Sequence, residues 1–311
     1  MQILVSGITG SIGAKLAPRL AAAGHEVRGM SRQPALETSH EGAGPPEIPV
    51  IAADAVSGEG LDAALAGIEV AYFLIHSMEA EAAGRFSELE RLAAENFVSA
   101  ARSAGVRRIV YLGGLMPTEG PASRHLASRL AVERILLEAT AESVALRASI
   151  VIGARSRSFR LLVRLVERVP ILLIPAWRDY RTAPIDERDV IAYLARAATA
   201  ELPSGQSLDI AGPQVVTYGQ LIERIRDQML VARPVINIPY VSATPIASRI
   251  SAMITGEDHG LIGPLMEGLT GDLLPRDDHA TKLLAVRRHS LDAAIERALR
   301  EWEEIEPLRA R

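Results

Sequence analysis

Short apolar runs alternate with helix-patterned stretches through the first half of this chain. The predicted strands are residues 3–5, 26–30, 49–53, 70–75, 108–112 and 144–152. The predicted helices between them are residues 14–23, 61–65, 80–104 and 123–139. In the longest of these, Phe86, Leu89 and Phe97 recur on one face at helical spacing. This alternation is typical of an α/β fold, a parallel, doubly wound sheet with right-handed crossovers.

The second half of the chain is less regular. The predicted helices are residues 159–169, 190–199, 218–230 and 291–305, and a short apolar run covers residues 171–175. Residues 231–285 contain many Pro, Gly and Ser, so we expect an irregular cap there. Ligands of doubly wound sheets bind beyond the carboxyl ends of the strands, and we expect this cap to cover those ends.

Three glycines, Gly7, Gly10 and Gly13, stand between the first predicted strand and the first predicted helix. Gly7 permits a tight turn, Gly10 lets a pyrophosphate approach the backbone, and Gly13 lets the helix pack close to the strand. The free N–H groups at the start of the helix then face the anion, helped by the helix dipole. Because the strand at 26–30 completes a βαβ unit, we predict dinucleotide binding rather than an ordinary strand-to-helix turn.

Composition narrows the class of protein. The chain has 311 residues, of which 48% are hydrophobic and 23% charged, and its net charge is −4 without a basic block. We therefore expect a globular protein that does not bind nucleic acid. No apolar run is long enough to span a bilayer and the chain begins with a predicted strand, so we expect a cytoplasmic protein. Without cysteine there are no disulfides or thiolates, and we expect no metal site.

Six segments together carry a resemblance to a known family. They are residues 6–13 (SGITGSIG), 72–78 (YFLIHSM), 94–97 (AENF), 105–115 (GVRRIVYLGGL), 146–153 (LRASIVIG) and 183–190 (APIDERDV). They resemble the short-chain dehydrogenase/reductase superfamily in its atypical extended branch, which includes NmrA-like and epimerase-like NAD(P)H-binding proteins. The resemblance implies a Rossmann domain over residues 1–152, with return segments at about 181–212. It also implies a substrate-binding cap and terminal helix over residues 153–180 and 213–311.

The resemblance further implies where an NAD(P) cofactor lies. The glycine turn would line the pyrophosphate, Asp54 would lie near the adenine, and His76 beside the adjoining ribose. Ile150 and Val151 would approach the nicotinamide. The full set of expected cofactor contacts is Gly7, Thr9, Gly10, Ser11, Ile12, Gly13, Ser31, Arg32, Asp54, Ile75, His76, Ser77, Gly113, Arg129, Ser149, Ile150 and Val151.

The end of the second predicted strand favours NADP(H) over NAD(H). An acidic residue there would accept from the ribose 2′-OH of NAD, but the strand ends on Ser31 and Arg32. Ser31 can donate a hydrogen bond, and Arg32 can form a bidentate contact with a 2′-phosphate. The alternative is that Arg32 is a solvated loop charge in an arginine-rich chain.

The Tyr-x-x-x-Lys pair of the superfamily is missing, because none of the six tyrosines has lysine four residues later. His125 and Arg129 stand at that place on the helix at 123–139, on one face. Arg129 is a fixed cation suited to a ribose diol or a phosphate, and it cannot donate a proton at neutral pH. His125 is our candidate general acid, and the alternative is a polar helix residue near the site. Asn96 matches a position of the family pattern and is the third residue of the predicted catalytic set.

Three functions fit these residues. The first is an NADPH-dependent reductase of a carbonyl, enone or quinone, with a small apolar or cyclic substrate. A quinone needs less from a Tyr-Lys pair because it delocalises the incoming charge. The second is a non-catalytic NADP(H) sensor or assembly factor, which the missing pair favours. The third is an epimerase or dehydratase, which usually needs the absent tyrosine. We expect a monomer or a homodimer.

Overall fold

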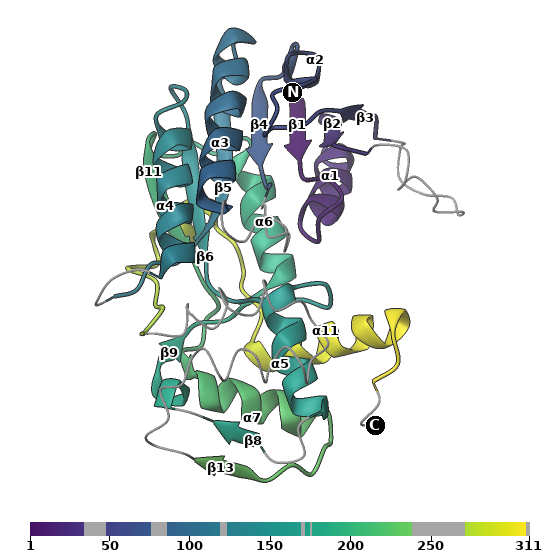
Figure 1. Cartoon of the computed structure of the whole chain (residues 1–311), viewed down its shortest axis with the longest axis vertical. Helices are drawn as coiled ribbons and strands as arrows, with labels where there is room; N and C mark the ends of the chain where they lie inside the picture. Colours follow the sequence, from purple (N-terminus) through teal and green to yellow (C-terminus); the bar gives the residue numbers. More distant parts are fainter. Residues whose placement is uncertain are drawn as a thin grey trace.

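A seven-stranded parallel sheet forms the centre of the protein in the computed structural model (Figure 1). The structure describes residues 1–33, 48–75, 86–118, 123–168, 172–174, 176–237 and 271–308. The strands, in spatial order, are β11 (Gln206–Ile210), β6 (Val144–Ala148), β5 (Arg108–Gly114), β4 (Val70–Phe73), β1 (Gln2–Ser6), β2 (Glu26–Ser31) and β3 (Val50–Ala52). Every neighbouring pair runs parallel, which confirms the predicted fold class.

Helices cover both faces of the sheet because successive side chains of each strand point to opposite faces. Ile3 and Val5 of β1 pack in one core with α1 (Gly13–Ala22) and α6 (Glu187–Ala197). Leu4, between them, packs in a second core on the other face. That core is formed with α2 (Leu61–Leu65), α3 (Phe86–Ser103) and α4 (Arg124–Leu137). Burial on both faces explains why the strands read as continuous apolar runs.

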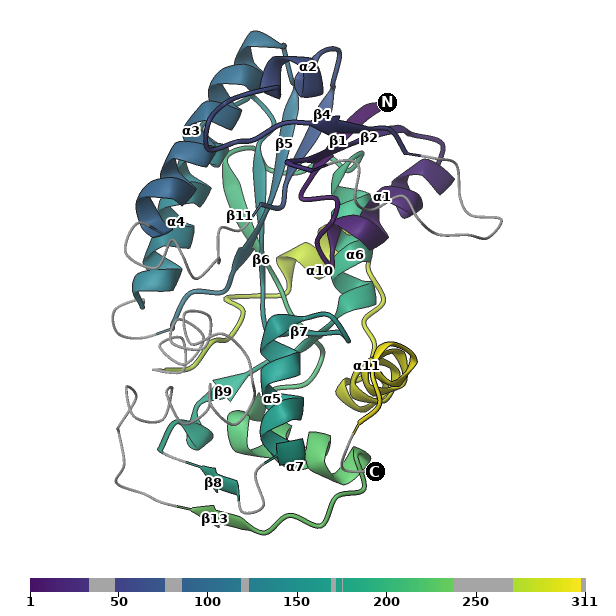
Figure 2. The same ribbon diagram turned by 45° about the vertical axis from the view of Figure 1, so that its right-hand side comes forward.

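The strand order reverses between β1 and β4. From β1 the chain proceeds outward through β2 and β3 on one side, and from β4 through β5 and β6 on the other. A crevice beyond the carboxyl ends of β1 and β4 is therefore the expected ligand site of this topology. In Figures 1 and 2 these ends face the lower part of the molecule.

The lower part has a third core of its own. It is built from α5 (Arg157–Arg168), α7 (Tyr218–Gln228) and α11 (Leu291–Ile305), with Phe159, Leu221 and Trp302 fully buried. Three two-stranded sheets lie outside the central sheet. They pair β7 (Val151–Ile152) with β10 (Ile185–Asp186), β9 (Arg181–Thr182) with β12 (Val216–Thr217), and β8 (Leu172–Ile174) with β13 (Val235–Asn237). Figure 2 shows α5, α7 and α11 grouped below the sheet.

Two predictions of local structure are wrong. The strand predicted at 144–152 is two strands, because the chain leaves the sheet after Ala148. Beyond that point the amide of Ser149 donates to the carbonyl oxygen of Ile210, and β7 pairs with β10 instead. The described ends of the region predicted to be irregular, 231–285, contain β13 and the short helix α10 (His279–Leu284). Within the described residues, no helix combines the length and apolar character needed to cross a membrane.

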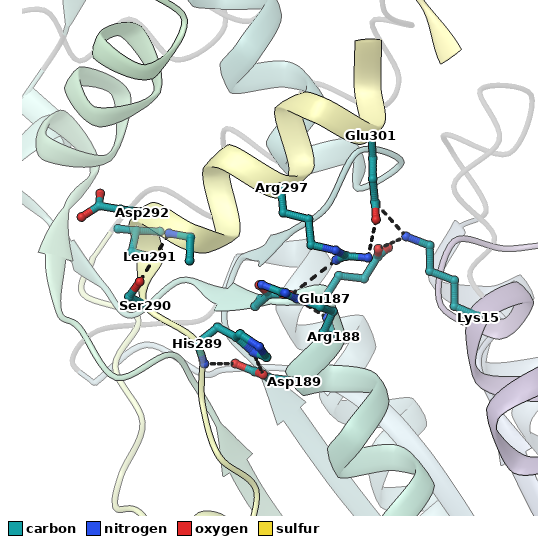
Figure 3. Close-up of polar contacts among 12 residues, drawn as sticks. Lys15, Glu187, Arg188, Asp189, His289, Ser290, Leu291, Asp292, Arg297 and Glu301 are labelled. Carbon is teal, nitrogen blue, oxygen red and sulfur yellow. Dashed lines mark hydrogen bonds and ion pairs between the residues drawn. The ribbon is translucent and has the colours of Figure 1, made fainter. Parts of the chain in front are cut away.

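Ion pairs fasten the terminal helix α11 to the sheet domain (Figure 3). Lys15 on α1 contacts the carboxylate of Glu187, the first residue of α6, and lies 3.0 Å from Glu301 on α11. Arg297 of α11 pairs with Glu301 and lies 3.7 Å from Asp186. These pairs tie the helix that follows the glycine turn to an element near the end of the chain.

Candidate cofactor and active site

A single cleft of about 1240 Å³ runs along the carboxyl ends of the strands. It brings together residues that are far apart in the sequence, from Gly7 to Leu273. Among the sequence-predicted residues that line it are Gly7, Thr9, Gly10, Ser11, Ile12, Gly13, Ser31, Arg32, Asp54, Ile75, Gly113, His125, Arg129, Ser149, Ile150 and Val151. His76 and Ser77 lie outside the described residues. The cleft therefore has the length and the lining that a dinucleotide site needs.

The glycine turn leaves room for a phosphate group. Gly7 adopts a φ of +66°, and a Cβ atom there would lie 2.9 Å from the carbonyl oxygen of Leu74. A Cβ on Gly13 would lie 2.9 Å from the carbonyl carbon of Gly7, so α1 can approach β1 this closely only with glycine. No side chain caps α1, and its first turn carries no acidic residue. The turn therefore presents backbone N–H groups to the cleft, which suits an anion.

The far end of the cleft is lined by polar residues that follow β2 and β3. The side chain of Ser31 accepts a hydrogen bond from the amide of Gln33 at 3.2 Å. Arg32 is exposed at the rim. Asp54 accepts from the amide of Val56 at 2.7 Å, which fixes its carboxylate in a tight turn. Ser31 and Arg32 thus line the cleft at the end of β2.

Asn96 does not contribute to the described cleft wall. Its side-chain amide donates to the carbonyl oxygens of Ala55, at 3.0 Å, and Val56, at 2.9 Å. The amide therefore ties α3 to the turn that begins at Asp54. This geometry gives no support to the predicted catalytic role, and we propose instead that Asn96 positions the turn.

His125 and Arg129 reach the cleft from the first two turns of α4. Ser123 caps this helix, because its side chain accepts from the amide of Leu126 at 3.3 Å. The imidazole ring of His125 lies 5.6 Å from the ring of Phe86, and its buried Nδ1 has no hydrogen-bond partner. Burial, together with the nearby Arg129 cation, lowers the pKa of His125 to about 4. The imidazole is therefore neutral near pH 7 in this structure, and the role of His125 as a general acid stays a prediction.

The wall opposite the glycine turn contains Ser149, whose hydroxyl lies 3.1 Å from that of Thr182. Tyr218, the first residue of α7, also lines the cleft and is 1% exposed. Its hydroxyl lies near the side chain of Thr182 without a strict hydrogen-bond geometry, and burial raises its pKa, which Thr182 partly opposes. Sequence reasoning missed this residue, because no motif surrounds it. The available signal was a tyrosine directly after a helix-capping threonine, Thr217.

Apolar side chains also line the cleft. Leu115, Leu161, Leu162 and Leu273 line it, while Arg155 and Arg157 lie exposed at its edge. A histidine-containing acidic segment lies at residues 277–279. Asp278 there pairs with Lys282 at 2.8 Å, and the described residues contain no group of three metal-binding side chains.

Comparisons with known proteins agree with this geometry. A family model described as NAD(P)H-binding matches residues 7–151. A 3-beta-hydroxysteroid dehydrogenase of Mycolicibacterium neoaurum is 30% identical over 118 residues, or 35% of this chain. The match spans only 31% of the length of that curated relative.

Two solved structures share the fold over nearly the whole chain. UDP-glucose 4-epimerase of Thermotoga maritima with UDP-glucose gives a TM-score of 0.73 at 14% identity, covering 98% of this chain and 99% of that one. UDP-glucuronic acid 4-epimerase of Bacillus cereus, with UDP-glucuronic acid and NAD, gives 0.71 at 17% identity, covering 98% and 100%. At this level of identity the likeness concerns the fold.

Proposed function

We propose that this chain, which carries an NAD(P)H-binding domain of the short-chain dehydrogenase/reductase type, is an NADPH-dependent reductase. Its substrate would be a carbonyl compound, an enone or a quinone. The observation that carries the proposal is the single cleft that joins the glycine turn to Arg129 and to the apolar wall around Leu161. We further propose that residues 1–152, with about 181–212, hold the cofactor, and that 153–180 and 213–311 hold the substrate.

The preference for NADPH rests on the rim of the cleft at Ser31 and Arg32. A bidentate guanidinium contact favours a 2′-phosphate, whereas a ribose 2′-OH is usually held by a carboxylate. The epimerase of Bacillus cereus holds NAD, so the fold by itself does not favour NADPH. The preference between NADPH and NADH would therefore be set by the side chains of Ser31 and Arg32.

When bound, NADPH would supply a hydride to the substrate. Arg129 would bind the ribose diol as a permanent cation, and the wall at Ser149 and Ile150 would orient the nicotinamide ring. Neither Arg129 nor the neutral His125 delivers a proton near pH 7. Water that enters the cleft would therefore supply the proton that completes the reduction. This favours an acceptor such as a quinone, in which delocalisation spreads the charge before protonation.

The substrate end suits an apolar ring. Leu115, Leu161 and Leu273 supply the apolar wall, and the buried hydroxyl of Tyr218 supplies one donor. The curated relative acts, by its name, on a hydroxysteroid, which is also an apolar ring system. The epimerases hold nucleotide sugars, but interconverting sugars in this fold usually needs the tyrosine that this chain lacks.

The decisive experiment follows NADPH absorbance with purified protein and a panel of quinones, enones and ketones. We expect turnover of at least one quinone, loss of turnover in Arg129→Ala, and a raised KM in Tyr218→Phe. Turnover that is unaffected by Arg129→Ala would contradict the site assignment.

A second candidate, a non-catalytic NADP(H) sensor, is favoured by the absent Tyr-Lys pair and by the neutral imidazole of His125. Calorimetry separates the two candidates. Tight NADPH binding with no turnover across the whole panel would support the sensor and exclude the reductase. Absence of binding by any nicotinamide nucleotide would contradict both.

A further inference from the structure

A buried carboxylate lies directly behind the part of the cleft wall that Arg129 forms. Glu90 of α3 is 5% exposed, and its Oε2 accepts a hydrogen bond from the hydroxyl of Ser128 at 2.8 Å. Its Oε1 lies 3.8 Å from Nη1 of Arg129, whose side chain is 12% exposed. Arg129 therefore stands between a buried negative charge and the open cleft.

The space around this pair is lined mainly by apolar side chains. A small void behind the cleft is lined by Phe73, Ile75, Glu90, Ala93, Tyr111, Arg129 and Val132. Ile75 and Arg129 also line the cleft, so the void and the cleft share one wall. The hydroxyl of Tyr111 is buried there without a hydrogen-bond partner, and burial raises the pKa of Tyr111 to about 12.

Burying a carboxylate removes it from water, which costs on the order of several kcal/mol of folding free energy. Neighbouring groups must therefore stabilise its charge. Burial raises the pKa of Glu90, while Arg129 and Ser128 oppose the rise by stabilising the carboxylate. Arginine has a long side chain with many rotamers, so a guanidinium needs such a partner to remain in one place. No other acidic side chain shares the void with Arg129.

We propose that Glu90 is a positioning residue that holds the guanidinium of Arg129 in the cleft wall. The inference rests on the proposed function, because it assigns Arg129 to the nicotinamide ribose. Glu90 acts from behind the wall and does not itself touch a ligand.

A purely structural role would be to join α3 to α4 through Ser128, and it predicts a different result. Glu90→Gln keeps the size of the side chain and an acceptor for Ser128, but removes the negative charge. A structural link would survive this change, whereas a charge that positions Arg129 would not. Glu95→Gln is the matched control, because Glu95 lies on the same helix in an exposed pair with Arg91 at 2.6 Å.

The first measurement is NADPH affinity by calorimetry. We expect Glu90→Gln to weaken NADPH binding by about tenfold or more, since a charge-assisted contact of Arg129 becomes mobile. Glu90→Asp, which keeps the charge, should recover part of the loss, and Glu95→Gln should bind as the parent does. Equal affinities of Glu90→Gln and Glu95→Gln would overturn the proposal. If the parent protein itself fails to bind NADPH, the proposed function fails with it.

The second measurement needs no cofactor. The Arg129 cation helps to hold the pKa of His125 down to about 4, so an NMR titration of the His125 ring reports where the guanidinium lies. We expect the midpoint to rise in Glu90→Gln, because Arg129 leaves its position. A midpoint that stays or falls would mean that the guanidinium has not moved, and would overturn the proposal. Should Glu90→Gln fail to fold, Ser128→Ala weakens the same anchor, and we expect smaller changes in the same directions.

Discussion

At the scale of single residues, the phosphate-binding turn depends on the absence of one atom. In Gly13→Ala, the new Cβ would overlap the carbonyl group of Gly7, and neither backbone can move without shifting α1 or β1. We expect NADPH binding to weaken by more than about tenfold, because backbone N–H groups lose their alignment with the anion. Calorimetry measures the loss.

A matched control for this change is Ala22→Gly, at the exposed end of the same helix. It costs about 1 kcal/mol of helix stability, but it leaves the turn intact. Affinity should therefore be kept in Ala22→Gly. An equal loss of affinity in both variants would mean that helix stability, and not the shape of the turn, governs binding.

The titration of His125 also belongs to this scale. Its folded-state pKa, about 4, lies below the value of 6.5 expected for an unfolded histidine. The unfolded chain therefore binds the proton more readily between these values, and stability is lost as the pH falls from about 6.5 towards 4. Above pH 6.5 His125 contributes no pH dependence. We expect the pH dependence of stability in this window to be reduced in His125→Gln, as measured by urea unfolding at a series of pH values.

The variant His125→Gln also tests whether His125 acts as a general acid in catalysis. If His125 were an imidazolium general acid, kcat/KM would fall in the parent as the pH rises through 6 to 7. We expect no such step, and parallel pH–rate profiles for the parent and His125→Gln. A step that disappears with His125 would restore the acid role inferred from the sequence.

At the scale of elements, a buried ion pair joins α1, α6 and α11 (Figure 3). The side chain of Glu187 is completely buried, and Lys15 and the partly exposed Glu301 and Arg297 lie near its carboxylate. Lys15→Met would remove the cation that contacts this carboxylate, and because Lys15 is itself partly exposed we expect a cost of about 1–3 kcal/mol. Urea unfolding measures the difference.

The second lysine of the chain provides the control. Lys282 pairs with Asp278 at an exposed site, so Lys282→Met should change stability by less than about 0.5 kcal/mol. Burial raises the pKa of Glu187 above its unfolded value, so its charged form opposes folding as the pH rises. The deficit of Lys15→Met should therefore shrink at low pH, and Lys15→Met combined with Glu187→Gln should recover much of it. A deficit that is independent of pH would contradict this account.

The bounds of a helix or strand could be predicted from the sequence where residues close to them in the chain determine them. Helix α11 follows Ser290, whose side chain accepts from the amide of Ala293, and its predicted bounds at 291–305 are confirmed. The break between β6 and β7 has no such signal, because residues 144–152 are mostly apolar, with Arg147 and Ser149 as the polar positions. It depends on partners elsewhere, Ile210 and β10, which sequence periodicity does not show. Strand β11 was not predicted as a strand, although the alternation of Ser207 and Asp209 with its apolar residues is the spacing of a half-buried strand.

At the scale of the whole molecule, the predicted doubly wound α/β fold is confirmed by the sheet topology, and a family model described as NAD(P)H-binding matches residues 7–151. The glycine turn could be predicted because its function is local. Tyr218, Leu273 and the pairing of Glu90 with Arg129 could not, because they depend on the packing of α3, α4 and α7 around one cleft. Such contacts join positions tens of residues apart, which no local pattern records.

A ligand in this cleft should therefore stabilise the molecule as a unit. NADPH at a hundred times its Kd would add about 2.7 kcal/mol to the free energy of unfolding, and NADH less at the same concentration. The difference between them should come from Arg32 at the rim, since a guanidinium distinguishes a 2′-phosphate from a hydroxyl. In Arg32→Ala we expect the Tm increase with NADPH to fall to that with NADH. In Ser31→Asp, NADH should become the better stabiliser, because an added carboxylate repels the phosphate and accepts from the 2′-OH. If Arg32→Ala keeps the full preference for NADPH, the 2′-phosphate is bound elsewhere and Arg32 is a solvated surface charge.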